Sequence, residues 1–258
     1  MEILVLYIYI INLERMIILI MKYVLDTHTH TLASGHAYNT INEMIIAAQE
    51  KKLQLLGITE HAPAMPGSCH SFYFSNFRII PRQYNNLQVC FGAEVNIMNY
   101  KGEIDLEDHI LPEMDYVIAS LHKCCIQPGS SSENTNAVIE AIKNPYVNII
   151  GHPDESLYNL DYDAICQAAK EYNVLLELNN SSLLPTSFRE GARENDIRLL
   201  NTCKKYNNYI SLGSDAHISN LIGEFNKVEE IINLTNDEEV KYILDHFDEF
   251  KKLCYRIY

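Results

Sequence analysis

Nine residues of the chain, seven histidines and two carboxylates, are of the types that bind catalytic metal ions. They are His28, His30, His36, His61, Glu94, His122, His152, Asp215 and His217. Imidazole and carboxylate groups are ligands of catalytic zinc, manganese and iron. A single tetrahedral ion needs only about three or four protein ligands. Nine such residues therefore indicate a cluster of two or three ions, an arrangement suited to phosphoryl chemistry.

Short apolar runs alternate with amphipathic stretches from Tyr23 onward. The apolar runs predict buried parallel strands at Tyr23–Leu25, Leu55–Ile58, Val89–Val95, Tyr116–Ala119, Val147–Ile150, Val174–Leu178 and Tyr209–Leu212. The amphipathic stretches predict helices at Thr40–Lys52, Asn134–Lys143, Asp163–Tyr172 and Asn195–Tyr206. Thr40 and Glu43 have the spacing of a capping box. Repeated strand–helix units predict an α/β fold, and about seven strands favour a closed or nearly closed parallel barrel.

Most of the nine candidate ligands follow a predicted strand. His28 and His30 come after the first strand and are two residues apart, so both point the same way in an extended segment. Asp215 and His217 repeat that spacing after the last strand. In a parallel barrel the carboxyl ends of the strands share one face, where active sites form. We therefore expect the candidates to converge there, whereas His109 and His246 fit ordinary surface positions.

The composition indicates a soluble globular protein. The chain has 258 residues, of which 47% are hydrophobic and 21% charged, and its formal net charge is −14. That charge argues against a nucleic-acid surface built on a basic patch. Seven cysteines without a C-x-x-C motif indicate reduced thiols, which is typical of a cytoplasmic protein. Cys124 and Cys125 are adjacent; beside the predicted cleft they are either plain loop residues or thiols that respond to oxidants or soft metals.

The first twenty residues differ in character from the rest. Two short apolar runs flank Asn12, Glu14 and Arg15, and neither reaches the about 20 residues of a membrane span. Met21 stands directly before the first predicted strand. We interpret residues 1–20 as a non-native or extra apolar extension, with translation beginning at Met21; the alternative is an apolar N-terminal anchor or an added helix. We interpret residues 21–258 as a single domain that does not bind a membrane.

Several segments together resemble the PHP (polymerase and histidinol phosphatase) superfamily, and within it the YcdX-type phosphatase branch. They are Asp26–Tyr38 (DTHTHTLASGHAY), Thr59–Pro66 (TEHAPAMP), Phe77–Arg82 (FRIIPR), Gly92–Leu106 (GAEVNIMNYKGEIDL), Asn148–Pro153 (NIIGHP), Leu176–Ser182 (LELNNSS) and Leu212–Phe225 (LGSDAHISNLIGEF). They span nearly everything from Tyr23 to about Leu234 and are specific as a set. Thr-Glu-His at Thr59–His61 departs from the commoner T-D-H, with the histidine intact.

The resemblance implies a distorted (β/α)7 barrel, TIM-like, with a trinuclear metal centre at the carboxyl ends of the strands. One ion would take His28, His30, Glu94 and Asp215, a second would take Glu94, His122 and His152, and the third would take His36, His61 and His217. Zinc is the implied metal, with manganese or iron also compatible. Glu94 would bridge two ions, and a possible homotrimer is implied as well.

The implied activity is metal-dependent hydrolysis of small phosphomonoesters by a metal-bound hydroxide. Asp215, Glu94 and His217 are the candidate catalytic residues, with Asp215 also handling protons. Asp26 and Glu60 are expected to orient the adjacent histidines. The alternatives are histidinol-phosphate hydrolysis, a PHP-type nuclease or phosphodiesterase activity, and a non-catalytic metal-binding protein.

An arginine is expected to bind the substrate phosphate through its bidentate fork. The candidates are Arg78, Arg82, Arg189 and Arg193. Arg189 is the first choice and Arg193 the second, because Arg189 follows the polar loop after the sixth predicted strand.

Overall fold

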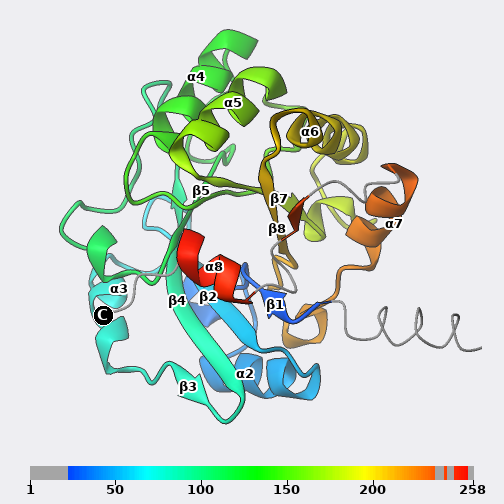
Figure 1. Cartoon of the computed structure of the whole chain (residues 1–258). Coiled ribbons are helices and arrows are strands. Elements are labelled where there is room, and N and C mark those ends of the chain that lie inside the picture. Colours follow the sequence, from blue (N-terminus) through cyan, green and yellow to red (C-terminus); the bar gives the residue numbers. More distant parts are fainter. Residues whose placement is uncertain (1–22, 236–240, 243–246, 255–258) are drawn as a thin grey trace, which may run out of the picture.

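The computed structural model describes residues 23–235, 241–242 and 247–254, which form a barrel of parallel strands wrapped by helices (Figure 1). The strands are β1 (Leu25–Asp26), β2 (Leu55–His61), β3 (Gln83–Tyr84), β4 (Leu87–Asn96), β5 (Val117–Ser120), β6 (Ile149–Ile150), β7 (Leu175–Asn179), β8 (Tyr209–Gly213) and β9 (Lys241–Tyr242). They lie in the order β1-β2-β4-β5-β6-β7-β8-β9, all parallel, with β3 pairing antiparallel to β4. The predicted TIM-like barrel is confirmed.

The barrel closes where the segment after β1 meets the segment after β8. A parallel bridge joins Thr29, after β1, to Ala216, after β8. Beside it, His30 N donates to Ala216 O over 3.0 Å and Asp215 N donates to His28 O over 2.9 Å. At the other end β8 pairs with β9 instead. The closing contacts thus belong to the two segments that carry the paired candidate ligands.

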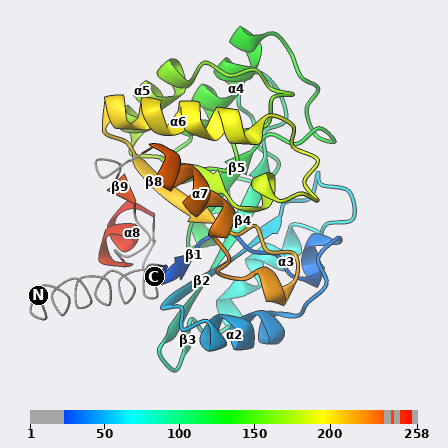
Figure 2. The same ribbon diagram turned by 90° about the vertical axis from the view of Figure 1, so that its right-hand side faces the viewer.

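Helices cover the outside of the barrel (Figures 1 and 2). They are α2 (Ile41–Glu50), α3 (Phe72–Ser75), α4 (Ser131–Ile142), α5 (Tyr162–Tyr172), α6 (Ala192–Tyr206), α7 (Asn226–Thr235) and α8 (Phe247–Leu253). The expected capping box is present: Thr40 Oγ1 accepts from Glu43 N, and the Glu43 carboxylate accepts from Thr40 N. Helices α4 to α7 pack side by side in chain order.

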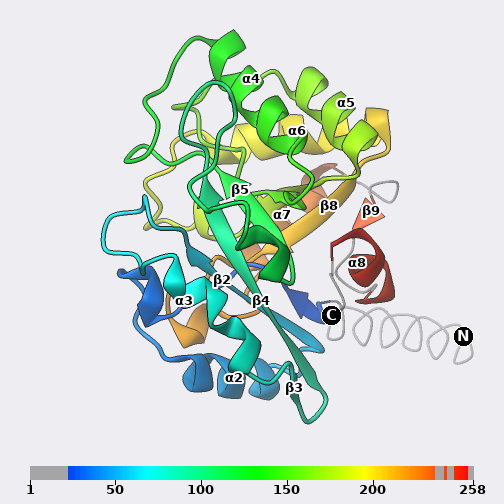
Figure 3. The same cartoon turned by 90° about the vertical axis from the view of Figure 1, so that its left-hand side faces the viewer.

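Helix α8 covers the amino end of the barrel, where Figure 3 shows it beside β9. Phe250 is fully buried and packs edge-on against Tyr116, with ring centroids 5.3 Å apart. Leu25, Leu55 and Leu175 complete this small inner cluster. A larger apolar layer lies between the strands and the outer helices. The amino end is thus filled by apolar side chains, which leaves the opposite end for polar groups.

All seven predicted strands and all four predicted helices are present. The strands β3 and β9 and the helices α3 and α8 were not predicted because they are brief. Helix α7 was also missed, although Val228, Ile231 and Ile232 give it an apolar face with helical spacing. No helix within the described ranges is long and apolar enough to cross a membrane. The prediction about residues 1–20 concerns a segment outside those ranges.

Candidate metal centre

The nine candidate ligands gather around the Glu94 carboxylate at the carboxyl end of the barrel. Glu94 lies near the end of β4 and is fully buried, and His61, the last residue of β2, pairs with it directly in the parallel ladder. Five imidazole nitrogens approach its two oxygens: His61 Nδ1 at 2.7 Å, His152 Nε2 at 2.9 Å, His28 Nε2 and His122 Nε2 at 3.3 Å, and His30 Nε2 at 3.4 Å. Strands β1, β2, β5 and β6 therefore all deliver a histidine to one carboxylate.

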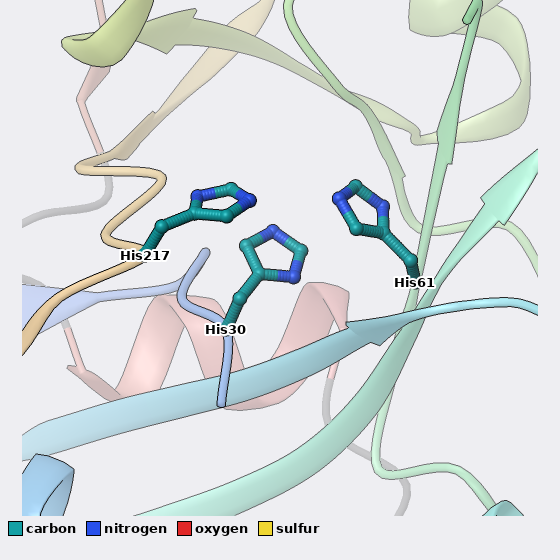
Figure 4. Close-up of side chains that lie close together, drawn as sticks. All are labelled: His30, His61 and His217. Atoms are coloured by element: carbon teal, nitrogen blue, oxygen red, sulfur yellow. The ribbon is translucent and has the colours of Figure 1, made fainter. Parts of the chain in front are cut away.

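Asp215 forms a second focus after β8. Its Oδ1 lies 3.3 Å from His30 Nε2 and 3.4 Å from His217 Nδ1. The His36 ring, from the loop after β1, stacks 4.9 Å from His61 and 4.7 Å from His217 between centroids. Figure 4 shows His30, His61 and His217 pointing toward a common space. The structure thus brings all nine candidates together.

Six buried polar atoms in this cluster make no hydrogen bond of acceptable geometry, although they lie close to one another. They are His28 Nε2, His30 Nε2, His61 Nδ1, His122 Nε2, Glu94 Oε2 and Asp215 Oδ1. Buried polar groups are nearly always paired, so six on facing side chains require an explanation. Divalent ions would satisfy them, because imidazole nitrogens and carboxylate oxygens are their ordinary ligands. The residues present therefore fit a metal cluster.

Three groups of three residues are compact enough to hold one metal ion each, because the ligand atoms within each group all lie within 4.8 Å of one another. They are His30, His61 and His217; His28, His30 and Asp215; and His61, Glu94 and His122. The group of His28, His30 and Asp215 is part of the set that the family resemblance implies for the first ion. The other two groups combine residues that the resemblance assigns to different ions. The distribution of the nine residues among ions stays a prediction.

The histidines of the cluster lower the pKa values of its two carboxylates, Glu94 and Asp215. Although burial acts to raise it, His61, His28 and His122 hold the pKa of Glu94 well below its usual range. Burial is likewise outweighed at Asp215, where His28, His30 and His217 keep the pKa well below normal. Both carboxylates are therefore ionised at neutral pH, the state that binds cations.

Side chains behind the cluster orient the histidines. Glu177, inside β7, lies 2.8 Å from His28 Nδ1 through Oε1 and accepts from His152 N over 2.8 Å through Oε2. Asn96 Oδ1 lies 2.7 Å from His122 Nδ1. Such partners fix the ring and the nitrogen that faces a metal. Sequence reasoning missed Glu177, although a carboxylate inside a buried apolar strand was a usable signal.

Asp26 and Glu60 contact the neighbouring histidines through the backbone and through a serine. Asp26 accepts from His28 N over 3.4 Å, and it also accepts from the backbone of Ser214 and Gly223, at 3.1 and 2.8 Å, which fixes the loop after β8. Glu60 accepts from Ser34 Oγ at 2.6 Å, and Ser34 Oγ lies 3.0 Å from His30 Nδ1 and accepts from His61 N over 3.0 Å. The expectation that both carboxylates orient adjacent histidines stays a prediction, and these indirect contacts are the route by which they would do so.

The backbone makes room for these contacts. A Cβ at Gly213 would lie 2.0 Å from Glu177 Oε1 and 2.7 Å from His28 Cβ, so no other residue type fits beside that pair. His152 and Asp215 adopt positive φ values of 30° and 52°. Non-glycine residues rarely take such angles, and they cluster at functional sites.

Exchange of Glu177 for glutamine should weaken metal binding about 10–100-fold, as loss of such supporting partners commonly does. The amide keeps the shape of the side chain and removes the charge beside His28. Metal affinity measured by competition with a chromogenic chelator tests this. Glu171→Gln, at the exposed end of α5, is the matched control. Equal affinity in both variants would contradict the assigned role.

A cleft of about 560 Å³ opens onto the cluster. Its lining includes His36, His61, His122, Asp215 and His217, together with Arg189, Lys123 and Glu155.

The two main arginine candidates differ in position. Arg189 lines the cleft, whereas Arg193 lines a different surface pocket, with its Nη1 3.9 Å from Glu230 Oε2. Arg82 pairs with Asp115 and backbone carbonyls, and Arg78 is exposed. Lys123 is a cleft cation that sequence reasoning missed.

Arg189 is held in place by several acceptors. Its Nη1 and Nη2 donate to Asp215 Oδ2 over 3.2 and 3.3 Å, and Nη1 donates to Ser182 Oγ over 2.9 Å. Burial acts to lower its pKa, but Asp215, Asp154 and Glu94 raise it. A fixed positive charge therefore stands beside the cluster, where an anionic substrate would enter.

The parallel barrel and the buried imidazole–carboxylate cluster at its carboxyl end place the protein in the class of metal-binding barrel proteins.

Comparisons with known proteins identify the family within this class. The family model described as PHP domain matches residues 26–183. The chain is 48% identical over 207 residues to a probable phosphatase of Caldicellulosiruptor bescii, covering 80% of this chain and 85% of that relative. It is 44% identical over 235 residues to a probable phosphatase of Clostridium novyi, covering 91% and 95%.

The chain belongs to the PHP family, and it is a phosphatase of that family, a hydrolase of phosphoric ester bonds. A solved histidinol phosphate phosphatase from Lactococcus lactis, in complex with zinc, L-histidinol and phosphate, has the same fold. Its TM-score is 0.58 at 16% identity, covering 85% of this chain and 95% of that one.

Proposed function

We propose that the protein hydrolyses small phosphomonoesters at a centre of three divalent ions, with zinc as the resident metal. The observation that carries this proposal is the set of six buried ligand atoms without a hydrogen bond, which belong to a cluster that borders the cleft through His61, His122 and Asp215. The nine side chains would hold the ions, and Glu94 would be shared between them. Bound ions would neutralise the phosphate and supply an acidified water as the nucleophile.

The protein groups have separate tasks in this reaction. Arg189, fixed by Asp215 and Ser182, presents a guanidinium to the phosphate oxygens. Asp215 borders the cleft, where it would help to hold an ion and to pass on the proton released by the attacking water. The buried cluster, with Glu94 fully shielded from solvent, keeps the electrostatic interactions strong.

The cleft fits a small ligand, because sites for such molecules have volumes of about 300–1,000 Å³. Histidinol phosphate is the second candidate substrate, since Glu155 lines the cleft and a carboxylate can pair with the amine of such a molecule. A screen of the zinc-loaded enzyme with p-nitrophenyl phosphate, histidinol phosphate and single-stranded DNA separates these activities. Cleavage of DNA alone, or no hydrolysis with verified metal, would contradict the proposal.

Exchange of Arg189 for alanine should raise the KM for a phosphomonoester about tenfold or more, because a bidentate, charge-assisted contact is lost. Metal content should stay unchanged, since Arg189 meets the metal cluster only through Asp215 Oδ2. Steady-state kinetics with elemental analysis of each preparation measure both. Arg193→Ala is the comparison: a KM that rises there and not in Arg189→Ala would reverse the assignment.

A further inference from the structure

Three sulfur atoms meet on the wall of the cleft, beside the imidazole cluster. Cys124 Sγ lies 3.5 Å from Met65 Sδ and 3.7 Å from Cys125 Sγ. The two cysteines follow β5 and the methionine follows β2, so separate segments bring them together. Cys124 is exposed, Cys125 half-buried and Met65 buried, and both Met65 and Cys124 line the cleft.

The turn that carries the two thiols is fixed by backbone hydrogen bonds. Cys125 N and Ile126 N both donate to His122 O, over 2.8 and 3.0 Å. The imidazole of the same His122 faces Glu94 through Nε2. His122 thus contacts both groups: its side chain belongs to the imidazole–carboxylate cluster, and its carbonyl oxygen fixes the turn that carries the two cysteines.

The separations from Cys124 Sγ to its two neighbours suit a shared ion. Metal–sulfur bonds are about 2.3 Å long, and three sulfurs spaced evenly around one ion are then about 4 Å apart. The distances from Cys124 Sγ to Met65 Sδ and to Cys125 Sγ both fall just short of that value. Cys166 and Cys203 are also 3.7 Å apart, but both are buried in the core and closed to an entering ion.

We propose that Cys124, Cys125 and Met65 form a binding site for one soft monovalent cation of the Cu(I) type, separate from the imidazole–carboxylate centre. Thiolate and thioether sulfurs select such ions, whereas imidazole and carboxylate groups suit zinc and other harder ions. The sulfur site would therefore bind soft ions and the imidazole–carboxylate centre harder ions, although both sites border the same cleft. The site does not depend on the phosphatase reaction.

Anaerobic titration of the zinc-loaded protein with Cu(I), buffered by bathocuproine disulfonate, tests this proposal. The wild type should take up one Cu(I) per chain, read from the loss of the chelator-complex absorbance, without releasing zinc to a zinc-sensitive dye. The double variant Cys124→Ser/Cys125→Ser should lose that uptake, because two of three ligands are gone. Met65→Leu, which nearly conserves volume, should bind more weakly than the wild type.

Cys69→Ser removes a half-buried thiol outside the sulfur group and should leave the uptake unchanged. Zinc content of the double variant, measured before titration, shows whether its fold and its metal centre are intact. Equal Cu(I) uptake by the wild type and an intact double variant would overturn the site. Uptake matched by zinc release would overturn it too, because the copper would then occupy the histidines.

Discussion

The Glu94→Gln variant should lose at least about 1,000-fold in kcat/KM and retain little bound metal. Five histidine nitrogens lie within 3.4 Å of the Glu94 oxygens, so this carboxylate is the common contact of the cluster. An amide keeps the volume but offers one weaker acceptor and two N–H donors to nitrogens that must themselves bind metal. Removing a charge-stabilising group at a reacting centre commonly costs about 10²–10³ in rate, and loss of an ion adds to that.

Hydrolysis of p-nitrophenyl phosphate, with metal content per chain measured on the same sample, tests the effect. Glu50→Gln, on the exposed end of α2, is the matched control and should behave as wild type. Circular dichroism establishes that the Glu94 variant is folded. A folded Glu94→Gln protein with full metal content and normal turnover would refute the central role given to Glu94.

Removal of metal should lower the melting temperature of the wild type by about 10 °C. A ligand present at about 1,000 times its Kd stabilises the native state by about 4 kcal/mol, and each kcal/mol shifts the melting temperature of a domain of this size by about 2–4 °C. The physical reason is local: without ions, six buried polar atoms make no hydrogen bond and the histidines crowd one another.

Calorimetry before and after dialysis against a chelator measures this shift, and re-addition of zinc should restore the original transition. Glu94→Gln serves as the comparison, since a protein that binds little metal has little stability to lose. An unchanged melting temperature in wild-type protein shown by elemental analysis to be metal-free would count against a buried multi-ion centre.

The barrel was predictable because its signals are local. The strands β2 and β4 to β8 lie in apolar runs whose lengths and flanks identify them without knowledge of their neighbours. The α8 helix that covers the amino end was not predictable in this way. Its Phe250 is buried against Tyr116, which directly precedes the distant strand β5, and nothing in the sequence of α8 indicates that partner.

The sequence predicted which residues form the site but not the hydrogen bonds that hold them in place. A histidine that follows a strand is visible in the sequence, and position at a barrel's carboxyl end supplies the convergence. The link from Glu60 through Ser34 to His30, by contrast, depends on side-chain directions. So does the pairing of Glu177 with His28, for which Gly213 must lack a Cβ.

The contacts that join β1 to the segment after β8 affect how the protein matures. Ser214 N donates to Asp26 Oδ1 across 188 residues of sequence, and the neighbouring bridge joins Thr29 to Ala216. Contacts of such long range form late, because the chain must first pay the entropy of closing the loop between them. A nascent chain lacking its last third presents His28 and His30 without Asp215 and His217. We therefore expect the protein to bind metal tightly only after synthesis and folding are complete, so that bound metal distinguishes the mature protein from incomplete chains.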